Sequence, residues 1–307
     1  MPVSLEGKLV IAVSSRALFD LNESNKIFDE KGELEYAKFQ IDHENEQLSC
    51  GVAFPLIKRL LELREPTTKQ NMVEIILISK NDANTGLRVF NSIEQHCLDI
   101  TRAAFTRGRS PYKYLKAFNA DLFLSANPED VKLALQNGYA SATIFSGTYL
   151  KKSKNDNEEF DEIRIAFDGD AVIFSDEAER INVEKGIEEF RKNEVEKSEV
   201  PLTPGPFKPF LAALNRLQET YKHYDKKPIR TALVTARNAP AHKRAIKTLR
   251  SWGISVDEAF FLGGLDKAAI LESFDPHIFF DDQHTYCLNA SKVVPTGHVP
   301  NGVKNDK

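Results

Sequence analysis

Two aspartates flank a glycine directly after an apolar stretch, in the segment Asp168-Gly169-Asp170. The stretch before them, Ile163–Phe167, is apolar or β-branched apart from one arginine, which is typical of a buried strand that ends at a turn. Carboxylates this close repel each other and are costly to bury unless a cation or a proton-transfer task holds them. A simple aspartate turn explains the motif when it is taken alone, so a catalytic interpretation needs support from the rest of the chain.

Polar side chains also follow three other expected strands of the second half. Thr235 ends one strand, Lys267 follows another, and Asp281 and Asp282 end a third. Each has a plain alternative, as a helix cap or a solvated surface side chain. Because ligands bind at the carboxyl ends of parallel strands, we expect the four segments to meet in one crevice.

Four carboxylates in one crevice predict a divalent cation with oxygen ligands, most simply Mg²⁺. The expected ligands are Asp168, Asp170, Asp281 and Asp282. A cation beside a lysine and a threonine forms a cradle for a phosphoryl group. These residue types therefore indicate phosphoryl chemistry.

The elements that must position these residues occur twice along the chain. The segment Leu9–Phe19 is similar to Ile163–Phe174 at an offset of 154 residues, and Glu74–Asp82 is similar to Arg230–Asn238 at an offset of 156. A repeat of this kind indicates two copies of one structural unit.

Within each copy strands alternate with helices, which predicts a parallel sheet with helices on both faces. Gly51 and Gly205 stand at matching places, each ahead of a proline and a helical run. An amphipathic helix is expected at Pro240–Trp252, ended by Gly253. The strands expected in the second copy are Ile163–Phe167, Ala232–Thr235, Ala259–Leu262, Ile278–Phe280 and Lys292–Val294.

The predicted fold class is therefore α/β, with two tandem Rossmann-like halves that each contain a parallel sheet. We expect one domain at residues 1–152 and a second at 160–300, connected by the charged stretch Lys151–Asp161. The second domain has a helical, cap-like insertion at about 176–228, and residues 301–307 form a polar tail.

Composition excludes several classes of function. The 307 residues are 41% hydrophobic and 28% charged, as in soluble globular proteins, and the net charge of −4 disfavours nucleic acid as a partner. No apolar run approaches the roughly 20 residues of a membrane helix, so no membrane partner is expected. Three cysteines without paired spacing favour a reducing, cytoplasmic location. The oligomeric state stays open, a homo-oligomer included.

The four segments resemble the motifs of the haloacid dehalogenase (HAD) superfamily of phosphatases in order and position: DGDAV, Thr235, Lys267 and the Asp281-Asp282 pair. The longer stretches IAVSSRALF, FDGDAVIFSDEAER, LVTARN, KTLRSWG and HIFFDDQ closely resemble the cytosolic 5′-nucleotidase type I family, along nearly the full chain. This resemblance implies HAD-like halves and a Mg²⁺-dependent phosphoric monoester hydrolase. Its expected substrates are nucleoside 5′-monophosphates, with AMP preferred.

The resemblance also implies a role for each residue. Asp168 would attack phosphorus, form an aspartyl-phosphate and ligate Mg²⁺. Asp170 would protonate the leaving 5′-oxygen and then deprotonate the water that hydrolyses the intermediate. Thr235 would hydrogen-bond a phosphate oxygen, and Lys267 would neutralise charge on the phosphoryl group and on Asp168.

Four further residues have expected places around this centre. Asp281 is expected most directly on Mg²⁺, with Asp282 beside it or behind it. Arg237 and Asn238, on the rim, are candidates for orienting the substrate or for capping the next helix.

The motifs report only on the phosphoryl group, so two alternatives stay open. One is a HAD-type phosphatase for another small phosphate ester, and the other is a catalytically silent, nucleotide-binding regulator. Base preference and activation by nucleotides are open as well. Phe207 or Phe210, near a Pro-rich loop, would stack on a base or pack into the core.

The first copy lacks the catalytic residue types. Ser14 and Arg16 stand in the places of Asp168 and Asp170. The other replacements are Ser79 for Thr235, Pro111 for Lys267, and Ser125 and Ala126 for the aspartate pair. This degenerate copy either packs against the second half or binds a nucleotide, as part of the substrate or as a regulator.

For the nucleotide-binding account, Ser14, Ser15 and Arg16 offer hydroxyls and a guanidinium suited to a phosphate. The flexible loop Gly108-Arg109-Ser110 is a further basic element.

Overall fold

Ten strands form a single sheet in a computed structural model that describes residues 4–145 and 162–305. The order across the sheet is β3-β2-β1-β4-β5-β10-β9-β6-β7-β8. Neighbouring strands are parallel except β5 and β10, which are antiparallel. The strands are β1 (Leu9–Val13), β2 (Val73–Ser79), β3 (Arg102–Phe105), β4 (Leu122–Ser125), β5 (Ser141–Ile144), β6 (Ile163–Phe167), β7 (Ile229–Thr235), β8 (Glu258–Phe261), β9 (Ile278–Asp281) and β10 (Thr296–His298).

This single sheet differs from the two separate parallel sheets that we expected. β5 and β10 meet at the middle of the sheet, where Ile144 pairs with Gly297 and Thr143 with His298. Two separate sheets would each leave an edge strand with unpaired backbone groups, and this antiparallel pairing removes both edges. The chain is thus α/β with one large, mostly parallel sheet.

Four of the five strands expected in the second copy are confirmed, with changes of a few residues at their ends. The expected strand at 292–294 is wrong. Val293 and Val294 donate their N–H groups to the carbonyl of Ala290 and so extend the end of α13 as a turn. The expected amphipathic helix is α11 (His242–Ser251), and Gly253 follows it with a left-handed φ of 66°.

Helices cover both faces of the sheet, as the alternation of strands and helices predicts. α4 (Phe54–Leu61), α5 (Leu87–Gln95), α10 (Lys208–Thr220) and α11 pack on one face. α6 (Tyr112–Leu115), α7 (Pro128–Gln136), α12 (Ala268–Phe274) and α13 (His284–Ala290) pack on the other. The residues of β1 alternate between the two sides, since Leu9, Ile11 and Val13 contact the first layer and Val10 and Ala12 the second.

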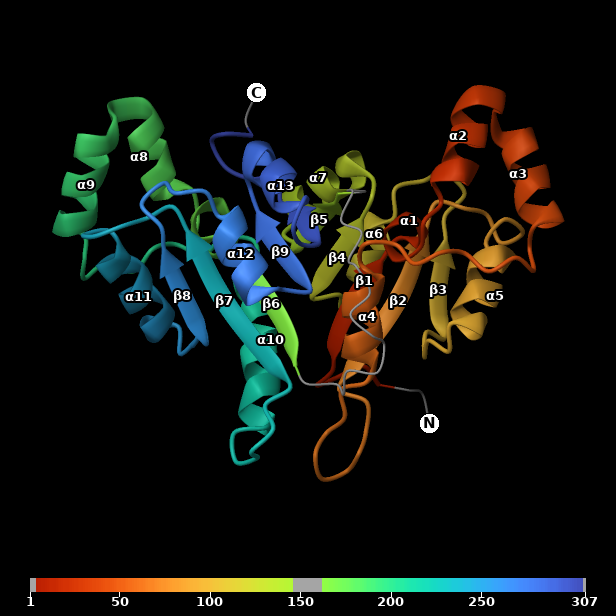
Figure 1. The fold of residues 1–307 in the computed structure, drawn as a ribbon, viewed down its shortest axis with the longest axis horizontal. Helices are drawn as coiled ribbons and strands as arrows, with labels where there is room; N and C mark the ends of the chain where they lie inside the picture. Colours follow the sequence, from red (N-terminus) through yellow and green to blue (C-terminus); the bar gives the residue numbers. More distant parts are fainter. Residues whose placement is uncertain (1–3, 146–161, 306–307) are drawn as a thin grey trace.

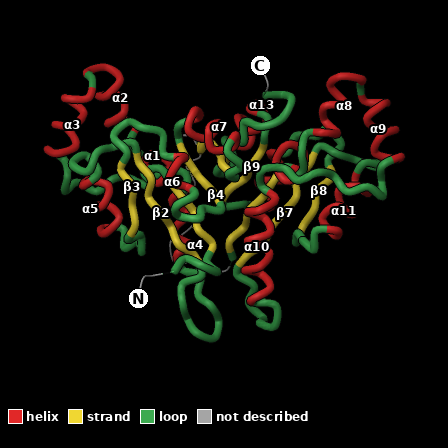
Figure 2. Tube along the Cα trace, turned by 180° about the vertical axis from the view of Figure 1, so that it is seen from behind, coloured by secondary structure: helices red, strands yellow, loops and turns green. Residues whose placement is uncertain are grey.

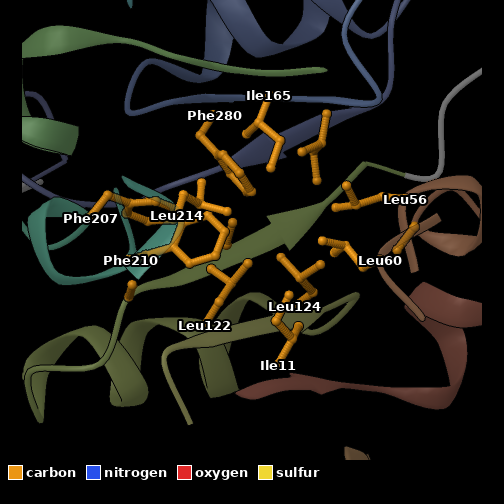
Figure 3. Close-up of a cluster of buried hydrophobic side chains, with 14 of the residues drawn as sticks. Ile11, Leu56, Leu60, Leu122, Leu124, Ile165, Phe207, Phe210, Leu214 and Phe280 are labelled. Atoms are coloured by element: carbon orange, nitrogen blue, oxygen red, sulfur yellow. The ribbon is translucent and has the colours of Figure 1, made fainter. Parts of the chain in front are cut away.

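One apolar cluster runs across the middle of the molecule (Figure 3). It joins Ile11 and Leu124 of the N-terminal strands to Ile165 and Phe280 of the C-terminal strands. Phe207 and Phe210 are fully buried within it, with their ring centres 6.2 Å apart. They therefore pack into the core, and the base-stacking interpretation of these two rings is wrong.

A pair of short helices lies at each end of the molecule, and both pairs lie beyond the carboxyl ends of the strands (Figures 1 and 2). One pair is α2 (Asn22–Lys31) and α3 (Glu33–Asp42), and the other is α8 (Glu177–Lys185) and α9 (Ile187–Glu196). Gly32 and Gly186 connect them with φ values of 84° and 86°, a conformation that glycine adopts readily. Such a hairpin thus occurs in both copies, while α10, also within the expected insertion at 176–228, packs on the sheet.

The expected connection at Lys151–Asp161 and the boundary at 152 lie outside the described residues. A short helix, α1 (Ser15–Leu18), follows β1 directly. Within residues 4–145 and 162–305, every helix is too short or too polar to cross a membrane.

Gly51 and Gly205 have matching structural roles. The N–H of Gly51 donates to the carbonyl of Leu18, and that of Gly205 donates to the carbonyl of Ile173. A Cβ atom at Gly51 would lie 2.7 Å from the carbonyl oxygen of Ala17, and one at Gly205 would press on two backbone carbonyls, those of Val172 and Phe174. Both glycines therefore allow close approach of the chain to the loop after the first strand of each copy.

We predict that Gly205→Ala lowers the free energy of unfolding by roughly 1–3 kcal/mol, because backbone must move to admit the methyl group. The control is Lys192→Ala on the exposed surface of α9, which should change it by less than about 0.5 kcal/mol. Thermal and denaturant unfolding measure both variants. Equal stability of the two would contradict the close-approach role of Gly205.

Candidate active site

The four polar strand ends of the second copy come together, as the sequence predicts. Asp168 follows β6, Thr235 ends β7, and Lys267 precedes α12. These three residues and Asp170 line a cavity of about 330 Å³. Asp281, at the end of β9, lies fully buried behind Lys267.

Lys267 joins two of the carboxylates. Its Nζ donates to Oδ1 of Asp168 at 2.7 Å and to Oδ2 of Asp281 at 2.6 Å, and its side chain is 3% exposed. Burial disfavours the charge on Lys267, but the two carboxylates outweigh it and raise the pKa of the lysine. The ammonium also lies 4.9 Å from the ring centre of Tyr286. Lys267 is thus a fixed positive charge beside Asp168.

Three buried carboxylates form a cluster suited to a cation. Oxygens of Asp168, Asp281 and Asp282 all lie within 4.8 Å of one another. Burial, with Asp281 adding to it and Lys267 opposing it, raises the pKa of Asp168 to about 7. One ammonium is therefore too little positive charge to keep the cluster fully ionised.

Asp282 is the carboxylate with free ligand atoms. Both of its side-chain oxygens are buried without a hydrogen-bond partner, and burial followed by repulsion from Asp168 raises its pKa. Asp281, in contrast, accepts hydrogen bonds from Lys267 and from the N–H of Gln283 at 2.8 Å. Orphaned carboxylate oxygens in such a cluster fit a hard divalent cation. Among the described residues, Asp282 therefore has more free oxygen atoms than Asp281.

Asp170 is not part of this cluster and pairs with Arg237. Nε and Nη2 of Arg237 donate to the two oxygens of Asp170 at 2.8 and 2.6 Å, and Nη1 donates to Glu194. The Arg237 side chain is 1% exposed, and the backbone N–H of Arg237 donates to Oγ1 of Thr235. Because every arm of the guanidinium has a carboxylate partner, Arg237 positions Asp170 in this state. Asn238 is exposed on the rim of the cavity.

A chain of buried charges extends from Asp170 into the helical hairpin. Glu194 on α9 is fully buried between Arg237 and Arg244, and it accepts a bond from Arg244 Nη1 at 2.8 Å. Arg244 in turn donates to Glu177 on α8 at 2.5 Å. The hairpin is therefore tied by ion pairs to the residue expected to move protons.

The sequence did not point to several residues that complete the site. Glu179 of α8 is buried, and one of its oxygens accepts bonds from Lys304 at 2.8 Å and Gln283 at 3.3 Å while the other has no partner. Phe190 and Tyr286 line the cavity as well. Phe190 occupies the repeat position of Tyr36, which is the one signal in the sequence that could have found it.

The C-terminal segment also belongs to this region. Residues 301–305, expected as part of a polar tail, lie against the loop after β6. Asn301 donates to the carbonyl of Ala171 at 2.8 Å, and Asn305 donates to that of Asp282 at 3.0 Å. This docking places Lys304 in the wall of the cavity.

Ser14, Ser15 and Arg16 do not join this site. They line a different cavity, of about 500 Å³, at the ends of β1, β2 and β4 in the first copy. The two cavities share no lining residue. The structure thus separates the expected substrate-binding residues into two groups.

Comparisons with known proteins agree with the geometry of the site. The sequence model of the 5′-nucleotidase family matches residues 1–306. The chain is 39% identical to human cytosolic 5′-nucleotidase 1B over 302 residues, which cover 95% of this chain and 48% of the relative. The chain thus spans about half the length of this curated relative. No solved structure matches it significantly.

The family match covers almost the whole chain and includes all four strand-end motifs. This chain therefore belongs to the 5′-nucleotidase family.

Proposed function

We propose that this protein is a Mg²⁺-dependent, cytoplasmic 5′-nucleotidase that hydrolyses nucleoside 5′-monophosphates, with AMP preferred. The observation that carries the proposal is the buried carboxylate of Asp168, which faces the cavity beside Lys267 and the two other carboxylates of the cluster. The name of the human relative, cytosolic 5′-nucleotidase 1B, supports both the activity and the location.

In the first step, an oxygen of Asp168 attacks phosphorus and the bond from phosphorus to the 5′-oxygen breaks. Asp170 gives its proton to that oxygen, so the nucleoside leaves as a neutral alcohol. Lys267 stabilises the charge on the transferring phosphoryl group, and Thr235 donates its hydroxyl hydrogen to a phosphate oxygen. The product on the enzyme is an aspartyl-phosphate at Asp168.

In the second step, Asp170 takes a proton from water as that water attacks phosphorus. The bond from phosphorus to the Asp168 oxygen breaks, which releases inorganic phosphate and restores both carboxyl groups to their starting states. Arg237 fixes the carboxyl group of Asp170 through two hydrogen bonds, so this residue acts through Asp170. We therefore assign Arg237 a positioning role in place of the direct contact with substrate that the sequence suggested.

The three clustered carboxylates would hold Mg²⁺, with Asp282 and Asp168 as the most direct ligands and Asp281 beside them. The cation supplies charge neutralisation, which lets a phosphate dianion approach an anionic nucleophile. Asp170, expected as a fourth ligand, is instead assigned to proton transfer because Arg237 occupies both of its oxygens.

The sheet order supports two tandem copies. Strands β3-β2-β1-β4-β5 follow the same sequence of neighbours as β8-β7-β6-β9-β10, read from the two edges of the sheet toward its middle. The two hairpins at α2–α3 and α8–α9 occupy matching places. We infer that the second copy is catalytic, with α8–α9 as the cap over its cavity, and that the first copy is degenerate.

A panel of phosphate esters tests the activity. With Mg²⁺, phosphate release is expected from nucleoside monophosphates and fastest from AMP, and EDTA should abolish it. Sugar phosphates and phosphoserine serve as competing esters. Faster phosphate release from one of these esters than from AMP would contradict the nucleotidase assignment. No phosphate release from any ester would indicate a nucleotide-binding protein without catalytic activity.

Asp168→Asn is expected to lower kcat by roughly 10³-fold or more, because the amide is a poor nucleophile toward phosphorus. The matched control is Asp225→Asn, the same change at an exposed loop residue, which should keep full activity. Folding is checked by thermal unfolding. Activity near wild type in Asp168→Asn would contradict the assignment of Asp168 as the nucleophile.

Asp282→Asn is expected to remove the stabilisation that Mg²⁺ gives to the folded protein. In wild type, Mg²⁺ at about a hundred times its Kd should add about 2.7 kcal/mol to the free energy of unfolding. The metal-free variant should be no less stable than wild type, because a neutral amide costs less to bury than a carboxylate without a partner. An unchanged response to Mg²⁺ would rule out Asp282 as a ligand.

Glu194→Gln tests the positioning of Asp170 through Arg237. We expect kcat for AMP to fall about tenfold or more with KM changed less than about threefold, because proton transfer and not substrate binding depends on this link. The control is Glu188→Gln on the same helix, whose side chain is 82% exposed. A rise in KM with kcat unchanged would show that Glu194 contributes to AMP binding and not to proton transfer.

A further inference from the structure

The larger of the two cavities described above lies in the copy that lacks catalytic carboxylates. It measures about 500 Å³, against about 330 Å³ for the candidate active site. It lies at the carboxyl ends of β1, β2 and β4, beneath the α2–α3 hairpin, and its volume is in the usual range for small-molecule sites.

The floor of this cavity carries hydroxyl groups in place of carboxylates. Ser15 and Ser79 are 5% and 2% exposed, and their Oγ atoms lie 3.0 Å apart. Ser79 Oγ also accepts the N–H of Asn81 at 3.2 Å. Because one hydroxyl of the pair donates to the other, one hydroxyl hydrogen remains without an acceptor among the described residues. A buried donor of this kind is suited to an anionic oxygen.

Two arginines that line the cavity have guanidinium groups without a partner among the described residues. Arg16 and Arg107 both line the cavity, and neither side chain has a hydrogen bond or ion pair within residues 4–145 and 162–305. Two backbone bonds hold the second arginine in place, from the N–H of Arg107 to Asn81 and from that of Gly108 to Lys80. Arg109, which the sequence suggested, does not line the cavity.

Most of the acidic residues around the cavity already have partners. Asp130 accepts bonds from Lys80 at 2.9 Å and from Ser110 at 2.8 Å. Asp82 accepts the N–H of Thr85, and Asp29 accepts the amide of Asn25, both at 2.8 Å. Glu33, in the first turn of α3, is the remaining acidic lining residue. Lys80 therefore neutralises Asp130, whereas Asp29, Glu33 and Asp82 keep their charge, and Arg16 and Arg107 are the cations left to receive an anion.

Two aromatic rings also line the cavity. Phe28 and Tyr36, from the two helices of the hairpin, meet edge to face with ring centres 5.7 Å apart. Tyr36 is fixed by a bond from its hydroxyl to Asn81 at 3.0 Å, whereas the Phe28 side chain is 47% exposed at the cavity. An exposed ring beside a cavity offers a face on which a flat heterocycle stacks.

We propose that this cavity is a second binding site, for a nucleoside monophosphate, that binds its ligand without a divalent cation and without hydrolysing it. The phosphate lies on Arg16, Arg107 and the Ser15–Ser79 pair, and the base lies against Phe28. The groups at the strand ends decide the difference from the catalytic cavity: the carboxylates there need a cation before a phosphate dianion can approach, whereas guanidinium and hydroxyl groups receive it directly. Without a carboxylate in the place of Asp168, no phosphoryl transfer follows.

The test is calorimetric titration of the full chain with AMP in EDTA, where the proposed hydrolysis is absent. One molecule of AMP per chain should bind, and Arg16→Ala and Arg107→Ala should each weaken it roughly tenfold or more. Arg109→Ala, a neighbouring exposed arginine outside the cavity, should leave the affinity unchanged. Phe28→Ala should weaken AMP but not inorganic phosphate.

Several outcomes would overturn the proposal. The first is that AMP does not bind in EDTA, and the second is that both arginine substitutions leave its affinity unchanged. The third is that inorganic phosphate binds as tightly as AMP. Because the titration does not depend on turnover, a failure here is separate from a failure of the nucleotidase assignment, which phosphate release from wild type and Asp168→Asn decides.

Discussion

A buried ammonium between two carboxylates sets the geometry on which the candidate active site depends. Lys267 contacts Asp168 and Asp281, which lie on the neighbouring strand ends of β6 and β9, so one side chain ties the two together. A buried charge without a partner costs several kcal/mol, so removing Lys267 would leave two buried carboxylates without their cation. The group nevertheless carries a surplus of negative charge, and Asp282 is the clearest sign of it. This surplus is what a divalent cation would neutralise.

The second constraint is the junction between the two copies. The antiparallel pair β5–β10 makes one sheet from ten strands, and the apolar cluster around Phe207 and Phe280 continues beneath it. This shared core gives the first copy a packing role that needs no carboxylates. Packing and ligand binding are compatible tasks for that copy, because the core lies within the sheet layers and the cavity lies at the strand ends.

The charge chain from Asp170 to α8 connects chemistry with the hairpin over the site. Arg237 and Arg244 bracket the buried Glu194, so the helix that carries Glu194 cannot move away without exposing or unpairing charges. In the part of the first copy that the structure describes, Tyr36, Asn81 and Gln40 form neutral hydrogen bonds at the matching hairpin, and Gln40 also accepts one from Arg88. The two cavities therefore share an architecture and differ in the electrostatics of their walls.

The sequence by itself determined the strand ends and the alternation of strands and helices, because both depend on local patterns of period two or 3.6. It also determined the repeat, since these patterns and the glycines that allow close backbone contact recur along the chain. It also identified Asp168, Thr235, Lys267 and the aspartate pair as neighbours, since parallel strands bring their carboxyl ends to one edge. Only the tertiary structure decided which charges pair. Lys267 and Asp168 are 99 residues apart, and the choice of Arg237 for Asp170 depends on loop geometry that no local pattern records.

The same reason applies to the single sheet, to the docking of Lys304 and to the division of the expected ligand residues between two cavities. Hydrophobic periodicity reports which face of an element is buried, but not which edge strand or loop from elsewhere in the chain meets it. Contacts of this kind arise when the elements pack, and packing is a property of the whole fold.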